Sequence, residues 1–287
     1  MRLNHNLASL NIYHQQSKVL QKQSQAMGRI SSGLKVNKAK DNPDALATSE
    51  RLRMQIRGTQ MAARNVQDGI SMLQTFEGTL GNVSEMVQRV RELAVKAGSG
   101  SNTPEDKGII QNEIKQIIAG LDDAANYTEF NGNKLLAYES KAADPSTDKL
   151  FMTTGANVEE RIEIPRFDIR SNKLKDSAGN TLSSIDVTAD GGVDSAIKTI
   201  DGITEKLLSI RSEYGALENS FESTYENLIE NGDRTQAAES GVRDADIAEE
   251  MLELSKSNIL IESAHAMLVQ TNKFPQEILR ILENMRK

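Results

Sequence analysis

Apolar residues recur along the first forty residues with the spacing of a coiled-coil helix. Two rows run through this stretch, each with members seven residues apart: Leu3, Leu10, Ser17, Ser24 and Ser31, and Asn6, Tyr13, Leu20, Met27 and Leu34. The step between the rows alternates between three and four residues, as on the contact face of a coiled coil. We expect a helix that presents this seam to a partner and ends at Gly33.

A second, much longer helix is predicted after a polar break. Asn42 suits the N-cap, and Pro43 suits the first helical position, whose N–H would be unpaired in any case. Three-four spacing then continues from Leu46 to Ala97, which corresponds to a helix of roughly 80 Å at 1.5 Å per residue. The sequence G-S-G-S-N at 98–102 ends it.

The middle of the chain predicts shorter elements. Thr103 with Asp106 forms a capping-box pattern that opens a helix, whose apolar face is Ile110, Ile114, Ile117 and Leu121. Residues 149–164 contain two alternating runs around a Gly-Asn turn, which predicts a β-hairpin. Residues 165–192 are polar and Gly-rich without a clear period, so we expect an exposed connection.

The C-terminal part repeats the pattern of long helices. Three-four spacing from Val193 to Leu228 predicts a helix that Asn231-Gly232 stops. A final helix carries two seven-residue rows, the first of which Pro275 interrupts. These rows are Ile247, Leu254, Ile261, Leu268 and Leu282, and Met251, Asn258, His265, Asn272 and Leu279.

The predicted fold is mainly α, with a discontinuous domain organisation. The two terminal helices, residues 1–40 and 247–287, pair as a coiled coil, and residues 41–164 with 193–246 form a long-helix bundle that carries the small hairpin. Residues 165–192 are left as a short exposed segment. The polar segment that contains Gly33, Asn42 and Pro43 then connects two helical layers.

Composition excludes several functional classes. Aromatic residues make up 4% of the 287 residues and Trp is absent, which favours narrow helical seams over a large compact core. The net charge of −7 argues against a nucleic-acid partner. Without cysteine there is no disulfide, thiolate catalysis or Cys-ligated metal. No apolar stretch is long enough to span a bilayer, and the N-terminus is too polar for a cleaved secretory signal.

No catalytic constellation emerges from the sequence. The histidines, His5, His14 and His265, have no metal-binding spacing, and His265 lies on a heptad row, where a packed or interfacial residue is expected. Carboxylate pairs such as Asp122-Asp123 are adjacent in sequence and would point about 100° apart on a helix. We expect neither an enzyme nor a cofactor.

Several long motifs, in order, resemble bacterial flagellin. They are M-R-L-N-H-N-L-A-S-L-N at the N-terminus, R-I-S-S-G-L-K-V-N-K-A-K-D from residue 29, N-V-Q-D-G-I-S-M-L-Q-T (65–75), Q-R-V-R-E-L-A-V-K-A (88–97), E-F-N-G-N-K-L-L (129–136), A-E-S-G-V-R-D-A-D-I-A-E-E-M (238–251) and S-K-S-N-I-L-I-E-S-A-H-A-M-L-V-Q (255–270). The resemblance covers about residues 1–137 and 193–287, and it implies that residues 165–192 are a short remnant of the family's variable outer region. It departs from the family pattern at Gly241, at Asn42-Pro43-Asp44 and in the tail from residue 272.

The resemblance implies a filament subunit, outside the cell, whose terminal helices are disordered in the monomer and fold together during assembly. A chain end without its partner buries too little surface to offset its ordering entropy, which agrees with this expectation. The resemblance also implies type III export without a cleaved signal, an export chaperone at the C-terminal helix, cap and hook-junction partners, and self-polymerisation. A hook–filament junction protein and a secreted coiled-coil adhesin remain alternatives, whereas an enzymatic flagellin would need a larger central insert.

The resemblance further assigns candidate site residues. The polymerisation seams comprise Leu3, Leu10, Leu20, Met27, Leu34, Ile247, Met251, Leu254, Ile261, Leu268 and Leu279. The spoke connector between the layers contains Gly33, Asn42 and Pro43. The positions that match contacts of the host toll-like receptor for flagellin are Gln88, Arg89, Leu93 and Glu113. Arg89 and Glu113 could instead serve only contacts between subunits.

Overall fold

The computed structural model describes residues 6–137, 149–176, 178–189 and 191–284, without the side chains of 278, 279 and 281–283. The chain divides into two compact units, residues 1–56 with 233–287 and residues 57–232. The first unit is made of two separate segments, and the second is one continuous segment. Helices α2 (Pro43–Ala97) and α4 (Gly192–Arg243) each contribute residues to both units. The unit borders therefore lie inside these helices, away from the loops at which the sequence placed its domain borders.

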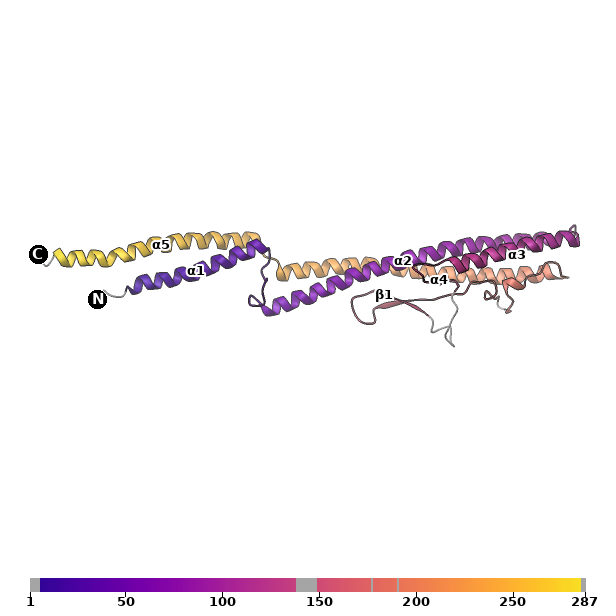
Figure 1. Ribbon diagram of the computed structural model, residues 1–287, viewed down its shortest axis with the longest axis horizontal. Coiled ribbons are helices and arrows are strands. Elements are labelled where there is room, and N and C mark those ends of the chain that lie inside the picture. The colour runs from indigo at the N-terminus through magenta and orange to yellow at the C-terminus, as the bar shows by residue number, and fades with distance from the viewer. Residues whose placement is uncertain (1–5, 138–148, 177, 190, 285–287) are drawn as a thin grey trace. The chain divides into compact units, whose positions relative to one another are not determined.

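The first unit is built on the pairing of the two terminal helices. Helices α1 (Leu7–Ser32) and α5 (Ile247–Asn284) lie side by side along most of their length (Figure 1). Gly33 ends α1 as predicted: its φ of 71° is left-handed, and its N–H bonds back to the Arg29 carbonyl at 2.8 Å. The predicted pairing of the chain ends is confirmed.

The second unit packs α2 and α4 with α3 (Pro104–Tyr127) around one hydrophobic core. The predicted seam of α2 is buried in it from Val66 to Ala97, and so are most apolar positions predicted for the third helix. The largest fully buried side chains include Leu73, Phe76, Leu80, Ile114, Leu121, Tyr214 and Phe221. Thr103 and Asp106 form the capping box that the sequence predicted at the start of α3.

The predicted β-hairpin is confirmed. Strands β1 (Leu150–Thr153) and β2 (Arg161–Ile164) are antiparallel, with Leu150 opposite Ile164 and Met152 opposite Ile162. These four apolar side chains are buried or half-buried and pack with the core. On the other face the Arg161 guanidinium lies 4.5 Å from the centre of the Phe151 ring.

The expectation that residues 165–192 form an exposed connection is wrong for the apolar side chains. Five of them are buried in the core: Ile169, Leu174, Leu182, Ile185 and Val187. A short 3-10 helix, η2 (Leu182–Ser184), is the one regular element among the described residues of this segment. These apolar residues show neither helical nor strand periodicity, because they lie in successive turns and not in one regular element.

One predicted helix break is also wrong. Helix α4 continues through Asn231-Gly232, and the chain breaks instead at residues 244–246, where Asp246 caps α5 by accepting from the Ala248 N–H at 2.8 Å. A glycine inside a helix costs only about 1 kcal/mol relative to alanine, which a long helix tolerates. Helix α5 continues through Pro275, in agreement with the single final helix that the sequence predicted.

Candidate functional site

The contact between α1 and α5 follows a regular three-four spacing of buried and half-buried residues. On α1 the rows are Ser9, Gln16, Gln23 and Ile30, and Ile12, Val19 and Ala26. On α5 they are Glu250, Ser257, Ala264 and Thr271, and Leu254, Ile261 and Leu268. The pair is thus a coiled-coil contact lined mainly by small and polar residues.

The predicted seams overlap this contact only in part. Leu254, Ile261 and Leu268 lie in it, half-buried, whereas both rows on α1 and the second row on α5 are displaced by one residue from the predicted rows. Leu10, Leu20, Met27 and Met251 are consequently exposed, and Ile247, which begins the undisplaced row on α5, is exposed as well. One residue corresponds to about 100° around a helix, which turns a side chain from the contact to the outside. Leu3 and the side chain of Leu279 lie outside the described residues, and Leu34 follows the end of α1.

Polar side chains pair across the contact about every second helical turn. Gln16 Nε2 lies 3.0 Å from His265 Nε2, and Gln23 Nε2 donates to Asn258 Oδ1 at 2.6 Å. Arg29 Nε lies 3.2 Å from Glu250 Oε1, in an ion pair without the alignment of a hydrogen bond. The apolar pattern located the row Leu254, Ile261 and Leu268 but not the contact face of α1, where glutamine, serine and alanine occupy more than half of the positions.

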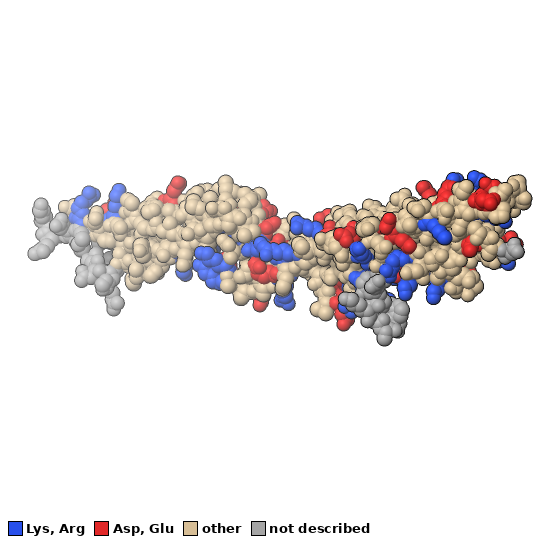
Figure 2. Space-filling view, turned by 45° about the vertical axis from the view of Figure 1, so that its right-hand side comes forward, with Lys and Arg blue, Asp and Glu red and all other residues tan. Residues whose placement is uncertain are grey.

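Large apolar side chains face outward from the same pair. Thirteen of those that the structure describes on α1 and α5 are 44–72% exposed, among them Leu7, Tyr13, Leu252, Ile259 and Phe274. Among the described residues of the two helices, Ala26 is the one apolar side chain that is buried. Lys18, Lys22 and Arg29 are the charged residues of α1, and the visible face of the pair in Figure 2 is mostly uncharged. Such a surface is typical of an interface.

The predicted spoke residues shape the connection between α1 and α2. Asn42 caps α2 by accepting from the Ala45 N–H at 3.1 Å, and Pro43 is the first helical residue. The connection is held against the break between α4 and α5: the Lys35 N–H donates to the Arg243 carbonyl at 2.7 Å, and the Ala245 N–H donates to the Gly33 carbonyl at 3.0 Å.

The Arg243 side chain fastens the same region to α2. Its Nη1 donates to Glu50 Oε1 at 3.0 Å and to the Ser49 hydroxyl at 3.3 Å. The fully buried Ser49 hydroxyl in turn donates to Glu239 Oε1 at 2.8 Å. Arg243 therefore contacts the connector through its carbonyl and α2 through its guanidinium, a role that sequence reasoning missed.

Arg89 and Glu113, two of the candidate receptor positions, form an ion pair between α2 and α3. Arg89 Nη2 donates to Glu113 Oε1 at 3.1 Å, and Nη1 donates to Glu92 at 2.9 Å. Hydrogen bonds to Glu92 first, and then to Glu113, raise the pKa of Arg89. Gln88 is exposed beside them, whereas Leu93 is only 2% exposed. Leu93 therefore packs α2 against the core and presents little surface to a partner.

The described residues offer no other site of recognisable chemistry. No group of three or more histidine, aspartate or glutamate side chains among them is arranged to hold a metal ion. None of the described helices is both long and apolar enough to cross a membrane.

Comparisons with known proteins agree along nearly the whole chain. The bacterial flagellin N-terminal helical region matches residues 3–141, and the C-terminal helical region matches residues 197–282. Flagellin of Bacillus subtilis (strain 168) is 39% identical over 303 residues, covering 98% of this chain and 100% of the relative. The flagellar filament 31.3 kDa core protein of Treponema maltophilum is 33% identical over 286 residues, covering 99% and 100%.

A similar fold is found among solved structures. A putative flagellar hook-associated protein from Vibrio parahaemolyticus has a TM-score of 0.59 at 17% identity, with 71% of this chain and 100% of that chain covered. At this identity the likeness concerns the fold alone.

Proposed function

The chain belongs to the bacterial flagellin family, and from that premise we propose that it polymerises through the outward faces of the α1–α5 pair. As a flagellin it is a structural subunit of the flagellar filament, which lies outside the cell, and it is not an enzyme. Its relatives are named as flagellins and filament core proteins, and the similarity covers their full length. This favours a subunit of the filament over a hook-junction protein or an adhesin.

One observation carries the proposed surface: the terminal pair exposes thirteen large apolar side chains and buries none of comparable size among its described residues. Burial of each such side chain contributes about 1.5–3 kcal/mol. A pair that leaves this contribution unused has little to offset its ordering entropy. Contacts with neighbouring subunits would supply it, so we expect the terminal helices to fold fully only on assembly.

The displaced seam residues fit this role. Leu10, Leu20 and Met27 on α1 and Met251 on α5 point away from the intramolecular contact and remain available to neighbouring subunits, and the exposed Ile247 at the start of α5 is available too. Leu254, Ile261 and Leu268 would instead contribute by holding the two helices together. We propose that Leu3 and Leu279 extend these rows.

Substitutions on α1 test the proposal. We expect Leu10→Ser with Leu20→Ser to leave the helical content of the monomer unchanged and to abolish tube formation in seeded assembly, as seen by negative-stain electron microscopy. The control is Leu208→Ser on α4, which removes a leucine of similar exposure, 54%, from outside the pair. A version without the first and last forty residues should stay monomeric. Normal tubes from the double variant would refute the proposed surface.

The remaining partners follow from the family resemblance. We propose that the chain is exported unfolded through the flagellar type III apparatus without a cleaved signal, with a chaperone on the exposed apolar face of α5, and that it assembles beneath a cap on hook-junction proteins. The spoke formed by Gly33, Asn42 and Pro43 would transmit contacts between the inner and outer layers. We also propose that Gln88, Arg89 and Glu113 contact the host toll-like receptor for flagellin, with Leu93 acting beneath them.

A further inference from the structure

Pro275 leaves one carbonyl inside α5 without its helical donor. In a helix the N–H of each residue bonds to the carbonyl four residues earlier, and proline has no N–H. The carbonyl affected by Pro275 is therefore that of Thr271. The side chain of Asn6 occupies this vacancy across the helix pair, with its Nδ2 donating to the Thr271 carbonyl at 3.1 Å.

The same asparagine also caps α1. Its Oδ1 accepts from the Ser9 N–H at 3.1 Å, so both ends of the amide are used. Ser9 offers only a donor and the Thr271 carbonyl only an acceptor, which fixes the orientation of the amide. The start of α1 is thereby joined to the one position of α5 at which proline removes the helical donor.

The polar pairs inside the contact cannot set the alignment of the helices by themselves. Gln16 and Gln23 are seven residues apart, as are their partners His265 and Asn258. A shift by one heptad would still place Gln16 opposite Asn258, which also forms hydrogen bonds. These pairs therefore fix which faces meet, yet they tolerate a shift of seven residues.

The contacts at the two ends do not tolerate that shift. Arg29 would leave Glu250, and Asn6 would face a carbonyl already bonded within the helix. A polar group inside a coiled coil can specify register in this way.

We propose that Asn6 and Pro275 act as a register lock for the terminal helix pair, with the Arg29–Glu250 ion pair as the second fixed point. The proposal concerns the pairing within one chain, and it rests on the proposed function because that pairing forms during assembly. The lock would exclude pairings shifted by one heptad. Such pairings would place the outward apolar rows at the wrong axial positions for contact with neighbouring subunits.

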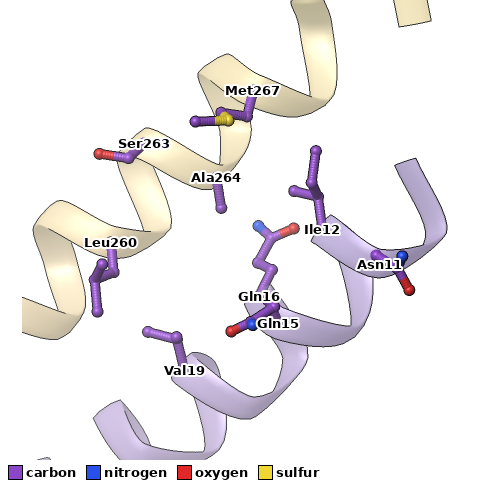
Figure 3. Close-up of a pocket in the computed structure, with 9 residues that line it drawn as sticks. All are labelled: Asn11, Ile12, Gln15, Gln16, Val19, Leu260, Ser263, Ala264 and Met267. Carbon is purple, nitrogen blue, oxygen red and sulfur yellow. The ribbon is translucent and has the colours of Figure 1, made fainter. Parts of the chain in front are cut away.

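Disulfide trapping can measure the register, because the chain has no cysteine of its own. Val19 and Leu260 face each other across a groove of about 320 Å³ between α1 and α5, with Ile12 and Met267 further along it (Figure 3). Cysteines at 19 and 260 report the native register. Cysteines at 19 and 267, or at 12 and 260, report shifts by one heptad in either direction.

The full-length chains would be oxidised under assembly conditions, and intramolecular disulfides would be separated from intermolecular ones by mass. Asn6→Asp is the informative variant, since aspartate keeps the cap acceptor and loses the donor to Thr271. Asn6→Ser, which keeps a cap acceptor but is too short to reach Thr271, is the second. Pro275→Ala restores the missing N–H and removes the need for Asn6.

We expect each Asn6 variant to lower the ratio of native to shifted disulfides about five- to tenfold in the natural background, in keeping with the loss of one hydrogen bond. In the Pro275→Ala background we expect no further change. An unchanged ratio, or an equal fall in both backgrounds, would overturn the lock. Tube formation is scored separately, so a chain that traps the native register but forms no tubes would count against the proposed function and leave the lock standing.

Discussion

Gln111 on α3 holds residues 185–187 through both ends of its side-chain amide. Its Nε2 donates to the Ile185 carbonyl and its Oε1 accepts from the Val187 N–H, each at 2.9 Å. The side chain is only 6% exposed. It thus supplies the donor and the acceptor that a neighbouring β-strand would otherwise provide, and this explains how a segment without regular structure is kept against the bundle.

Replacing Gln111 by leucine should destabilise the second unit by about 2–5 kcal/mol, because it leaves two buried backbone groups without partners. Urea unfolding followed by far-UV circular dichroism would measure the loss. Gln116→Leu is the matched control on the same helix, since Gln116 is exposed and its replacement should change stability by less than about 0.5 kcal/mol. Equal effects of the two variants would show that the amide does not anchor the segment.

The sequence predicts those features of this structure that depend on interactions between residues close together in the chain. Caps at Asn42 and Thr103 and the stop at Gly33 involve hydrogen bonds within a few residues, and all three are found. The faces that α1 turns inward could not be predicted, because Gln16 and Ala26 are buried while Leu20 is exposed. Under the proposed function the apolar rows of α1 serve contacts outside the chain, and a single sequence does not distinguish such rows from an internal seam.

The burial of the apolar side chains in residues 165–192 could not be predicted from the sequence for a different reason. Ile169, Leu182 and Val187 are held by long-range contacts, such as those of Gln111 and that of Asp122 with the Ser171 N–H at 2.6 Å. None of these contacts leaves a periodic pattern. Asn231-Gly232 was misleading because turn-forming residues act weakly against a helix that packs on both sides of them.

Arg243→Met should loosen the connection between α1 and α2. The substitution leaves the buried Ser49–Glu239 pair without its cation and should cost about 2 kcal/mol. Hydrogen exchange in assembled filaments should accelerate at Lys35 and Ala245, the amides that pair across the two connectors. Arg53→Met is the control, because Arg53 also pairs with Glu50 but at an exposed position. Unchanged exchange at both amides would show that the Arg243 side chain does not stabilise the connection.

Arg89→Ala should reduce activation of the host receptor by the monomer at least tenfold, because it removes an exposed guanidinium held in place by Glu92 and Glu113. A receptor-reporter cell assay would measure this effect. Arg91→Ala provides the comparison: Arg91 is similarly exposed but pairs with Asp201 on α4. Should both variants signal like the natural chain, the ion pair at Arg89 would serve only to join α2 and α3.

The loop between β1 and β2 should respond to acid through Glu160. Hydrogen bonds from the Asn157 side chain, at 2.7 Å, and from its backbone N–H, at 3.0 Å, lower the pKa of the Glu160 carboxyl. Its contribution to stability is therefore fully present above the ordinary value of about 4.3 and is lost as the pH falls through the lower folded-state value. Below that pH the loop should open while the helices persist.

Selective ¹³C labelling of glutamate would follow this titration in the monomer by NMR. In Asn157→Ala the strongest hydrogen bond to the carboxylate is absent, so the pKa of Glu160 should move up towards its ordinary value. If Glu160 titrates at the same pH with and without the Asn157 side chain, the loop is held by its backbone alone.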